Sequence, residues 1–350
     1  PGGNYTNKKA VNQYNLPPSF TPTVEMDSNT PFSFQNNQTI QLHRYLPNDV
    51  GQTYLDICRW VKEAVPSMHV HAFSPLEVWQ GAKTLGLPIS DFLRELKEAG
   101  LGTLPGTAAE ILDDEVRKDL CPDKINTSQW LEVMEAAHEQ GFNTTATIMF
   151  GHLERYKNVA RHLLRVKNLQ RKTGGFTEFV ILPFIHMESP LYLKGKARRG
   201  PTFREAVLIH AVSRLVLSPE FMNIQASWTK LGHEGIKACL RAGVNDIGGT
   251  LMNETITRAA GASHGQETSP SEMEKLIESV GRQPRQRTTS YGHVSDIQRQ
   301  KSLRACDLAE PVYASAEKYE RKSSRKKSKL VRPGLDNLGG EEKITSADIV

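Results

Sequence analysis

The length and composition of the chain are typical of a globular protein with a sizeable core. Of its 350 residues, 38% are hydrophobic and 24% are charged, and no stretch approaches the roughly 18 to 20 apolar residues that span a bilayer. A transmembrane helix is therefore excluded. About 150 residues per domain would give two domains, but one α/β barrel of about 250 residues with tails accounts for the length equally well.

The net charge of +5 is concentrated in one short segment. Residues 318–332 hold eight Lys or Arg against one Glu, so the rest of the chain is close to neutral. A short, Ser-rich basic run is more often a solvated tail than a nucleic-acid surface. We therefore expect residues 296–350 to be a basic, disordered tail, and we expect neither a nucleic-acid nor a membrane partner.

The four cysteines are too far apart for any compact ligand set. Cys58, Cys121, Cys239 and Cys306 are separated by at least 63 residues. This spacing gives no CxxC pair, no zinc motif and no disulfide framework. It favours a reducing soluble compartment, such as the cytoplasm.

The pattern of the chain changes near residue 48. Residues 1–47 are rich in Asn, Thr, Pro and Gln and predict a disordered or non-homologous segment. Amphipathic helices then alternate with short β-branched runs, which indicates βαβ units. The expected helices are 54–65, 76–85, 90–99, 128–140, 153–172, 202–217, 232–242 and one from about 253. The expected strands are 68–73, 101–104, 143–150, 177–184, 222–227 and 244–249.

Six strands, each followed by a helix, fit either a doubly wound sheet or a (β/α) barrel. No Gly-rich phosphate fingerprint follows any strand, and polar residues recur where strands end, which favours the barrel. Because eight strands close such a barrel, the sequence predicts an incomplete (β/α) TIM-type barrel over residues 48–295. Its two missing strands would have to precede residue 68.

The strand ends carry the residues that are candidates for chemistry. Loops after barrel strands meet at one mouth, so these polar side chains are expected to converge: His71, Thr107, His152, His186, Gln225 and Asp246. His69 and His71 lie two apart and share one face of their strand. They are either two ligands of a divalent metal, as in a metal-dependent hydrolase, or hydrogen-bonded histidines that orient a substrate.

Other candidates have structural alternatives. Glu110 either holds a ligand or forms a helix capping box with Thr107. Glu154 follows His152 by two residues and either serves the site or pairs with a nearby cation such as Arg198. Asn245 and Asp246 precede a Gly-Gly pair that a ligand can approach closely, or that only serves a turn.

Several long runs resemble a known family. MHVHAFSPLEV, GLGTLPGTAAEILDDEVR, FVILPFIHMESPLYLKGKARRGPTFREAV, NIQASWTKLG, GVNDIGGTLMNETITRAAGASHG and RQPRQRTTSYG are similar to the radical SAM enzymes that build the deazaflavin FO. The resemblance is to the CofH-type subunit, the second half of FO synthase. It covers about residues 51–292.

The resemblance implies a chemistry and a set of site residues. In this family a 4Fe-4S cluster and S-adenosylmethionine generate a radical that cleaves L-tyrosine, and the 4-hydroxybenzyl fragment joins 5-amino-6-(D-ribitylamino)uracil. The implied cofactor-binding residues are Glu110, His152, Glu154 and Gln225. The implied catalytic residues are His69, His71, His186 and Asp246, with Asn245 and Thr250 binding substrate. The implied partner is the first-half FO synthase activity, fused or separate.

One feature of the family is absent from this sequence. Radical SAM enzymes hold the cluster with a CxxxCxxC loop after the first strand, and no such triplet occurs here. Gln41 stands where a glycine pair is expected, in the region of the two missing strands. The chain is thus a fragment of an active enzyme, a catalytically inactive barrel kept for ligand binding, or one part of a split enzyme. We expect it to be inactive as written.

Overall fold

The computed structural model describes residues 50–251, 253–306 and 310–315. The predicted amino-terminal segment 1–47, Gln41 and the basic run 318–332 lie outside these residues. The long helices are α2 (Val50–Ala64), α3 (Pro75–Leu85), α4 (Ile89–Glu98), α6 (Thr127–Glu139), α7 (Tyr156–Thr173), α9 (Phe203–Leu217) and α10 (Trp228–Arg241). The shorter ones are α5 (Asp114–Leu120), α8 (Pro190–Leu193), α11 (Ile256–Ala259), α12 (Pro270–Glu278) and α13 (Asp296–Arg304).

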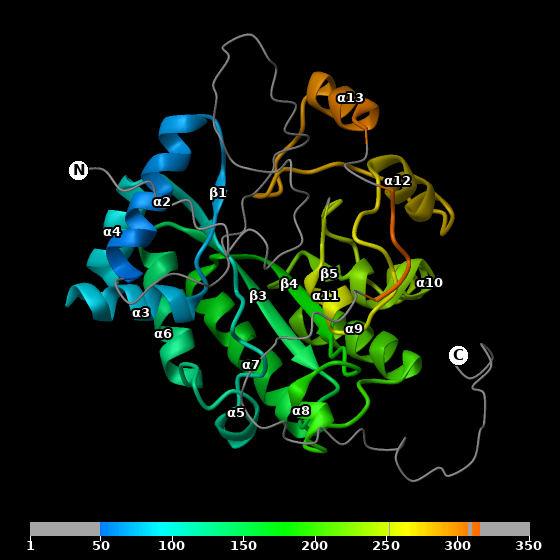
Figure 1. Ribbon diagram of the computed structural model, residues 1–350, viewed down its shortest axis with the longest axis horizontal. Helices are drawn as coiled ribbons and strands as arrows, with labels where there is room; N and C mark the ends of the chain where they lie inside the picture. Colours follow the sequence, from blue (N-terminus) through cyan, green and yellow to red (C-terminus); the bar gives the residue numbers. More distant parts are fainter. Residues whose placement is uncertain (1–49, 252, 307–309, 316–350) are drawn as a thin grey trace, which may run out of the picture. The chain divides into compact units, whose positions relative to one another are not determined.

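Five parallel strands form one sheet, in the order in which they occur in the chain. They are β1 (Val70–His71), β2 (Leu101–Leu104), β3 (Asn143–Phe150), β4 (Phe176–Pro183) and β5 (Ile224–Ala226). Each strand is joined to its neighbour through helices that lie outside the sheet (Figure 1). Sequential parallel pairing with helical crossovers is the construction of a (β/α) barrel, so the predicted incomplete barrel is confirmed.

The sixth predicted strand, 244–249, is wrong. Only Asp246 pairs there, through an isolated parallel bridge to Gln225. Gly248 has a φ of 74°, and its N–H donates to Oδ1 of Asp246 at 2.7 Å. The side chain of Asp246 thus turns the backbone away after one bridge, because a local side-chain acceptor competes with the sheet for the backbone donor.

The two faces of the sheet differ in composition. Side chains alternate along a strand, and Ala146, Ile148 and Phe150 of β3 pack into a core with the helices. The alternate residues Thr145 and Thr147 therefore face the opposite, concave side. The same alternation directs Glu178 of β4 and Gln225 of β5 to the concave face, where hydrogen-bonding groups line the interior.

Helix ends follow local capping chemistry. Ser74 and Glu77 form a capping box at the start of α3, and Asn126 with Gln129 does the same for α6. These reciprocal bonds satisfy backbone N–H groups that a helix start leaves without partners. The helix boundaries predicted from sequence therefore agree with the structure to within a few residues.

The carboxy-terminal segment begins with a helix. Ser295 accepts from the backbone of Gln298 and caps α13, so residues 296–304, which the sequence assigned to a disordered tail, are helical. The rest of that segment beyond residue 315 lies outside the described residues.

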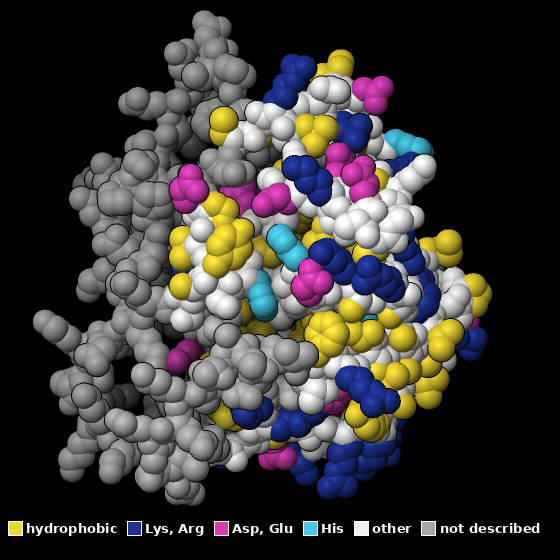
Figure 2. Space-filling view, turned by 90° about the vertical axis from the view of Figure 1, so that its right-hand side faces the viewer, with side chains coloured by type: hydrophobic (Ala, Val, Ile, Leu, Met, Phe, Trp, Pro, Cys, Tyr) yellow, Lys and Arg dark blue, Asp and Glu magenta, His cyan; other side chains and the backbone are white. Residues whose placement is uncertain are grey.

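The outer face also exposes hydrophobic side chains. Leu208, Val212 and Leu215 of α9 recur at helical spacing with exposed fractions of 49%, 36% and 78%. On one face of the molecule, hydrophobic side chains lie among Lys and Arg (Figure 2). Within the described residues, the helices are all too short or too polar to cross a membrane.

Candidate active site

Three polar clusters lie on the concave face and at the strand ends. The histidine cluster consists of His69, His71 and Thr103. The mouth cluster follows the carboxyl ends of the strands and consists of Glu110, Lys124, Lys230, Glu254 and Thr257. The carboxylate cluster consists of Glu178, Gln225, Asp246, Arg287 and Tyr291.

The histidine cluster confirms that the two imidazoles share one face. Nε2 of His69 and Nδ1 of His71 each lie 2.7 Å from the Thr103 hydroxyl oxygen. Burial, with Lys62 nearby, lowers the pKa of His69 below its ordinary value, so this ring is neutral at pH 7. The arrangement fits the alternative of hydrogen-bonded histidines that orient a substrate. Among the described residues, no third His, Cys, Asp or Glu completes a metal site.

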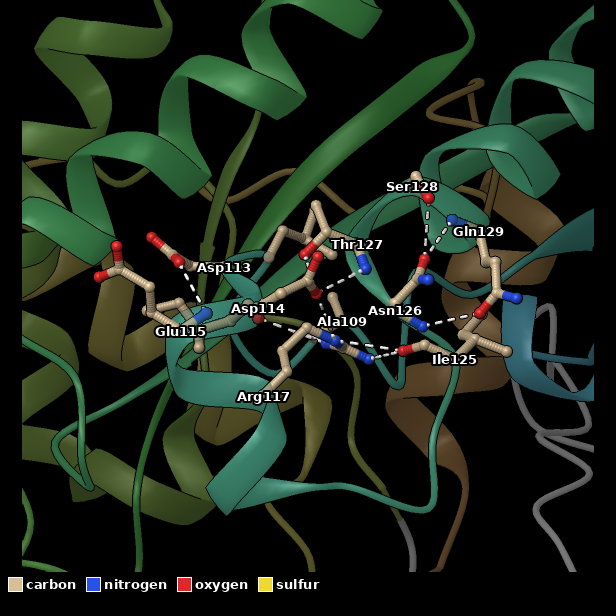
Figure 3. A network of polar contacts seen from close by, with 12 residues as sticks. Ala109, Asp113, Asp114, Glu115, Arg117, Ile125, Asn126, Thr127, Ser128 and Gln129 are labelled. Atoms are coloured by element: carbon tan, nitrogen blue, oxygen red, sulfur yellow. Dashed lines mark hydrogen bonds and ion pairs between the residues drawn. The ribbon is translucent and has the colours of Figure 1, made fainter.

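Glu110 lies in a loop that Arg117 organises. The buried guanidinium of Arg117 donates to the carbonyl oxygens of Ala108, Ala109, Ile111 and Ile125, and Figure 3 shows two of these four contacts. Glu110 itself has a φ of 44°, and its carbonyl accepts from Met149 of β3 at 2.7 Å. The loop is thereby fixed against the carboxyl end of the sheet.

Of the two alternatives for Glu110, the capping box with Thr107 does not form. Helix α5 begins later and is capped by Asp113, because Arg117 holds the intervening carbonyls. The Glu110 carboxylate instead pairs with Lys124 at 2.5 Å. The buried Thr107 hydroxyl has no hydrogen-bond partner within the described part of the chain. Glu110 and Thr107 are thus available for a role other than capping.

His152 and Glu154 shape the turn after β3. Glu154 accepts from the N–H groups of Gly151 and His152 at 2.7 and 2.9 Å and pairs with Arg198 at 3.0 Å. Nε2 of His152 donates to the Met149 carbonyl, while Nδ1 accepts from the N–H of Leu153. Burial lowers the pKa of His152, although the negative charge of Glu154 acts to raise it. Both side chains are thus hydrogen-bonded within the turn that they hold.

His186 lies apart from the three clusters. It is half-buried in the segment after β4, with its ring 4.7 Å from that of Tyr192 in an edge-on arrangement. Burial and the neighbouring Arg199 lower its pKa.

Asn245 and Thr250 are not in the carboxylate cluster either. Asn245 is exposed, and its Oδ1 accepts from Arg214 at 2.6 Å and from the N–H of Ile224 at 2.9 Å. Thr250 offers its carbonyl to Thr268. Of the neighbours 245 and 246, only Asp246 faces the interior.

Asp246 and Gln225 both belong to the carboxylate cluster. Sequence patterns did not predict that Glu178, Arg287 and Tyr291 would join them. Arg287 bridges the two acids, with Nε 2.5 Å from Asp246 and a terminal nitrogen 3.1 Å from Glu178. The Tyr291 hydroxyl contacts both carboxylates and lies 2.6 Å from Asp246. Gln225 donates to Glu178 at 3.0 Å. Arg287 and Tyr291 lie in the run RQRTTSYG, which carried part of the family resemblance, but sequence patterns gave neither residue a role in a site.

The charges in the carboxylate cluster do not balance. Burial and the charge of Asp246 raise the pKa of Glu178 to about 7, while Arg287 opposes the rise. Burial, together with the charges of the same acids, raises the pKa of Tyr291 above its ordinary range, so its hydroxyl remains a donor. Two carboxylates facing one guanidinium favour one extra proton, and Glu178 is its main site near neutral pH.

This proton makes stability depend on pH. The folded-state pKa of Glu178, about 7, lies above its ordinary value of 4.5. The stabilisation is therefore present below about pH 4.5 and is lost as pH rises through 7. We expect Glu178→Gln, compared with wild type in urea unfolding from pH 5 to 8, to remove this decline. The exposed Glu139→Gln should keep the wild-type profile, and an unchanged profile in Glu178→Gln would contradict the assignment.

A surface hollow outside these clusters contains none of the predicted residues. Its lining includes Asp119, Phe184, Leu191 and Lys194, between α5 and α8.

Comparison with known proteins identifies the family. Residues 173–300 match the family described as CofH/MqnC C-terminal region. The chain is 48% identical over 239 residues to the 5-amino-6-(D-ribitylamino)uracil–L-tyrosine 4-hydroxyphenyl transferase of Methanocaldococcus jannaschii, covering 67% of each chain. It is 50% identical over 266 residues to the FO synthase of Streptomyces coelicolor, covering 76% of this chain.

These relatives differ in length. The chain spans 30% of the Streptomyces FO synthase and about two thirds of the Methanocaldococcus transferase. Among solved structures, methylornithine synthase is similar with a TM-score of 0.49 at 16% identity, covering 68% of this chain and 65% of that chain. With nearly half of the aligned residues identical to a named transferase across two thirds of its length, the chain belongs to the CofH-type 4-hydroxyphenyl transferase family.

Proposed function

We propose that this chain provides the substrate-holding part of a radical SAM transferase in FO biosynthesis. The substrates would be L-tyrosine, the donor of the 4-hydroxybenzyl group, and 5-amino-6-(D-ribitylamino)uracil, its acceptor. The observation that carries the proposal is the 48% identity to the Methanocaldococcus transferase. The first-half FO synthase activity, fused or separate, would be the partner.

The concave face supports this proposal chemically. A ribityl-uracil presents many hydroxyl and amide groups, which require donors and acceptors at fixed positions. The Thr103, Thr145 and Thr147 hydroxyls and the two histidines lie on that face. Thr145 and Thr147 also hold the backbone of Gly106 at 2.7 and 2.6 Å, which fixes the loop that leads to Glu110.

S-adenosylmethionine is the proposed cofactor of the mouth cluster. The half-buried Glu110 and the Thr107 hydroxyl, which is buried without a partner among the described residues, offer an acceptor and a hydroxyl to the polar groups of this cofactor. When reduced by one electron from a donor outside this chain, the bound cofactor would supply the radical. Protein groups around it would orient the substrate and exclude water.

The cysteines of this chain do not fit a 4Fe-4S cluster. Cys58, Cys121 and Cys239 are buried in separate places, and Cys306 is exposed. Burial raises the pKa of Cys58 and of Cys239 to about 12, so these thiols stay protonated, whereas cluster ligands are thiolates. We derive no step through the cluster from these residues.

Anaerobic reconstitution tests the proposal. The polypeptide as written, supplied with iron and sulfide, should show no cluster absorbance near 400 nm and no turnover of L-tyrosine, while calorimetry should detect binding of L-tyrosine and of the ribityl-uracil. A stoichiometric cluster would contradict the misfit of the cysteines. Failure to bind either substrate would contradict the proposed function.

A metal-dependent hydrolase is the competing function. His69 and His71 share the Thr103 hydroxyl rather than opposing a third ligand. Metal analysis of the purified protein separates the two functions. One zinc per chain that is lost in His71→Ala would favour the hydrolase.

A further inference from the structure

The mouth cluster contains a lysine and a glutamate that face each other without direct contact. Lys230 lies in the first turn of α10, directly after β5, and its ammonium donates to the Thr257 hydroxyl at 3.1 Å. That hydroxyl lies 3.0 Å from Oε1 of Glu254. One threonine hydroxyl therefore separates a positive from a negative side chain in a largely buried setting.

Oε1 of Glu254 accepts from the N–H and the hydroxyl of Thr257, but neither Lys230 nor Glu254 has an oppositely charged partner among the described residues. In the described part of the chain, Thr257 is the hydrogen-bond partner of Lys230, and no carboxylate lies within ion-pair distance of its ammonium. Oε2 of Glu254 is buried and, among the same residues, has no hydrogen-bond partner. Burial lowers the pKa of Lys230, while Glu254 and Glu110 oppose this. A buried charge without a contact partner is costly, so an absent ligand is the natural partner of both groups.

We propose that Lys230 and Glu254 recognise an α-amino-acid zwitterion, with the Lys230 ammonium binding the α-carboxylate and Oε2 of Glu254 accepting from the α-ammonium. A ligand that carries both charges on adjacent groups completes both halves of the separated pair. Thr257, which touches both side chains, is then a positioning residue. Its bonds fix the distance between the two charges.

Two ligands of the proposed function contain an α-amino-acid zwitterion. L-Tyrosine and the methionine part of S-adenosylmethionine each present one α-carboxylate and one α-ammonium. The inference rests on the proposed function only for this choice of ligands. The arrangement of Lys230, Thr257 and Glu254 points only to a zwitterion and does not depend on which of the two ligands binds.

Binding by calorimetry to the full chain tests the proposal with ligands that lack one charge. The tyrosine series is L-tyrosine, tyramine without the carboxylate, and 3-(4-hydroxyphenyl)propionate without the ammonium. We expect Lys230→Met to reduce the preference for L-tyrosine over tyramine by roughly tenfold or more, and Glu254→Gln to reduce the preference over the propionate similarly. S-Adenosylmethionine and its decarboxylated form make the second series.

Matched variants separate recognition from folding. Lys237→Met and Glu234→Gln change the same residue types on α10, where the two side chains pair with each other at 2.7 Å, and both should keep the wild-type preferences. A uniform loss of affinity for every ligand in the Lys230 and Glu254 variants would mean a structural role and overturn the inference. Unchanged preferences would overturn it as well.

The wild-type protein distinguishes this failure from failure of the proposed function. If the protein binds S-adenosylmethionine with a preference that Lys230→Met and Glu254→Gln reduce, but does not bind L-tyrosine, the inference is supported and tyrosine is contradicted as the substrate of this chain. If it binds L-tyrosine with preferences that neither variant changes, tyrosine is supported as the substrate and the inference is contradicted. Wild-type protein that binds no amino acid would overturn both.

Discussion

Arg287→Ala should destabilise the protein by about 3–5 kcal/mol, the usual cost of removing one partner from a buried ion pair. Arg287 is the cation that faces both Glu178 and Asp246, and its side chain is 27% exposed. Its loss leaves two nearby carboxylates with Tyr291 and Gln225 as neutral donors. Urea unfolding at pH 7.5 measures the change.

A second substitution checks the cause. In the Arg287→Ala background, Asp246→Asn removes the repulsion with Glu178 and should recover part of the lost stability. Arg285 lies two residues before Arg287 and its side chain is exposed. Arg285→Ala should therefore change the free energy of unfolding by at most about 0.5 kcal/mol. Equal effects of Arg285→Ala and Arg287→Ala would show that the bridge does not stabilise the fold.

Arg117→Ala should cost at least about 3 kcal/mol, because it leaves several buried carbonyl oxygens without donors. Arg117 is 3% exposed, and its guanidinium serves carbonyls on both sides of Glu110 as well as Ile125. Thermal or urea unfolding gives the change. Binding of S-adenosylmethionine should weaken in parallel, because the loop that presents Glu110 loses its support.

The matched control for Arg117 is an exposed arginine on another helix. Arg94 pairs with Asp91 one turn away on α4 and is 55% exposed, so Arg94→Ala should be nearly neutral. Arg117→Lys tests the geometry, since an ammonium cannot reproduce the planar fork of a guanidinium. Full stability of Arg117→Lys would show that charge alone supports the loop.

Local patterns in the sequence predicted most of the barrel elements. The helices that begin at a capping box, such as α3 after Ser74 and α6 after Asn126, carry their start signal within four residues. The shared face of His69 and His71 follows from the two-residue period of a strand. Each of these features depends on neighbours in the chain, so the sequence shows them directly.

The wrong predictions arose where a long-range or side-chain contact competed with local preference. The run 244–249 contains the β-branched residues Val244 and Ile247, but the Asp246 carboxylate binds the N–H of Gly248 and the pairing ends there. For Thr107 and Glu110 the sequence left a capping box open as one of two alternatives, and it does not form because Arg117 holds the loop between them and α5 in another conformation. A pattern of residue types cannot reveal which acceptor a backbone donor will find.

The amino-acid sequence by itself determined the βαβ order, the shared face of His69 and His71 and the absence of a cysteine triplet, because these depend on composition and short spacing. Only the tertiary structure joined Glu178 to Arg287 and Tyr291, which lie 109 and 113 residues away, and separated Lys230 from Glu254 by one hydroxyl. The segment after α12 packs against the sheet and brings Arg287 and Tyr291 to Glu178. Such packing joins residues that are distant in the chain, so local sequence patterns do not contain it.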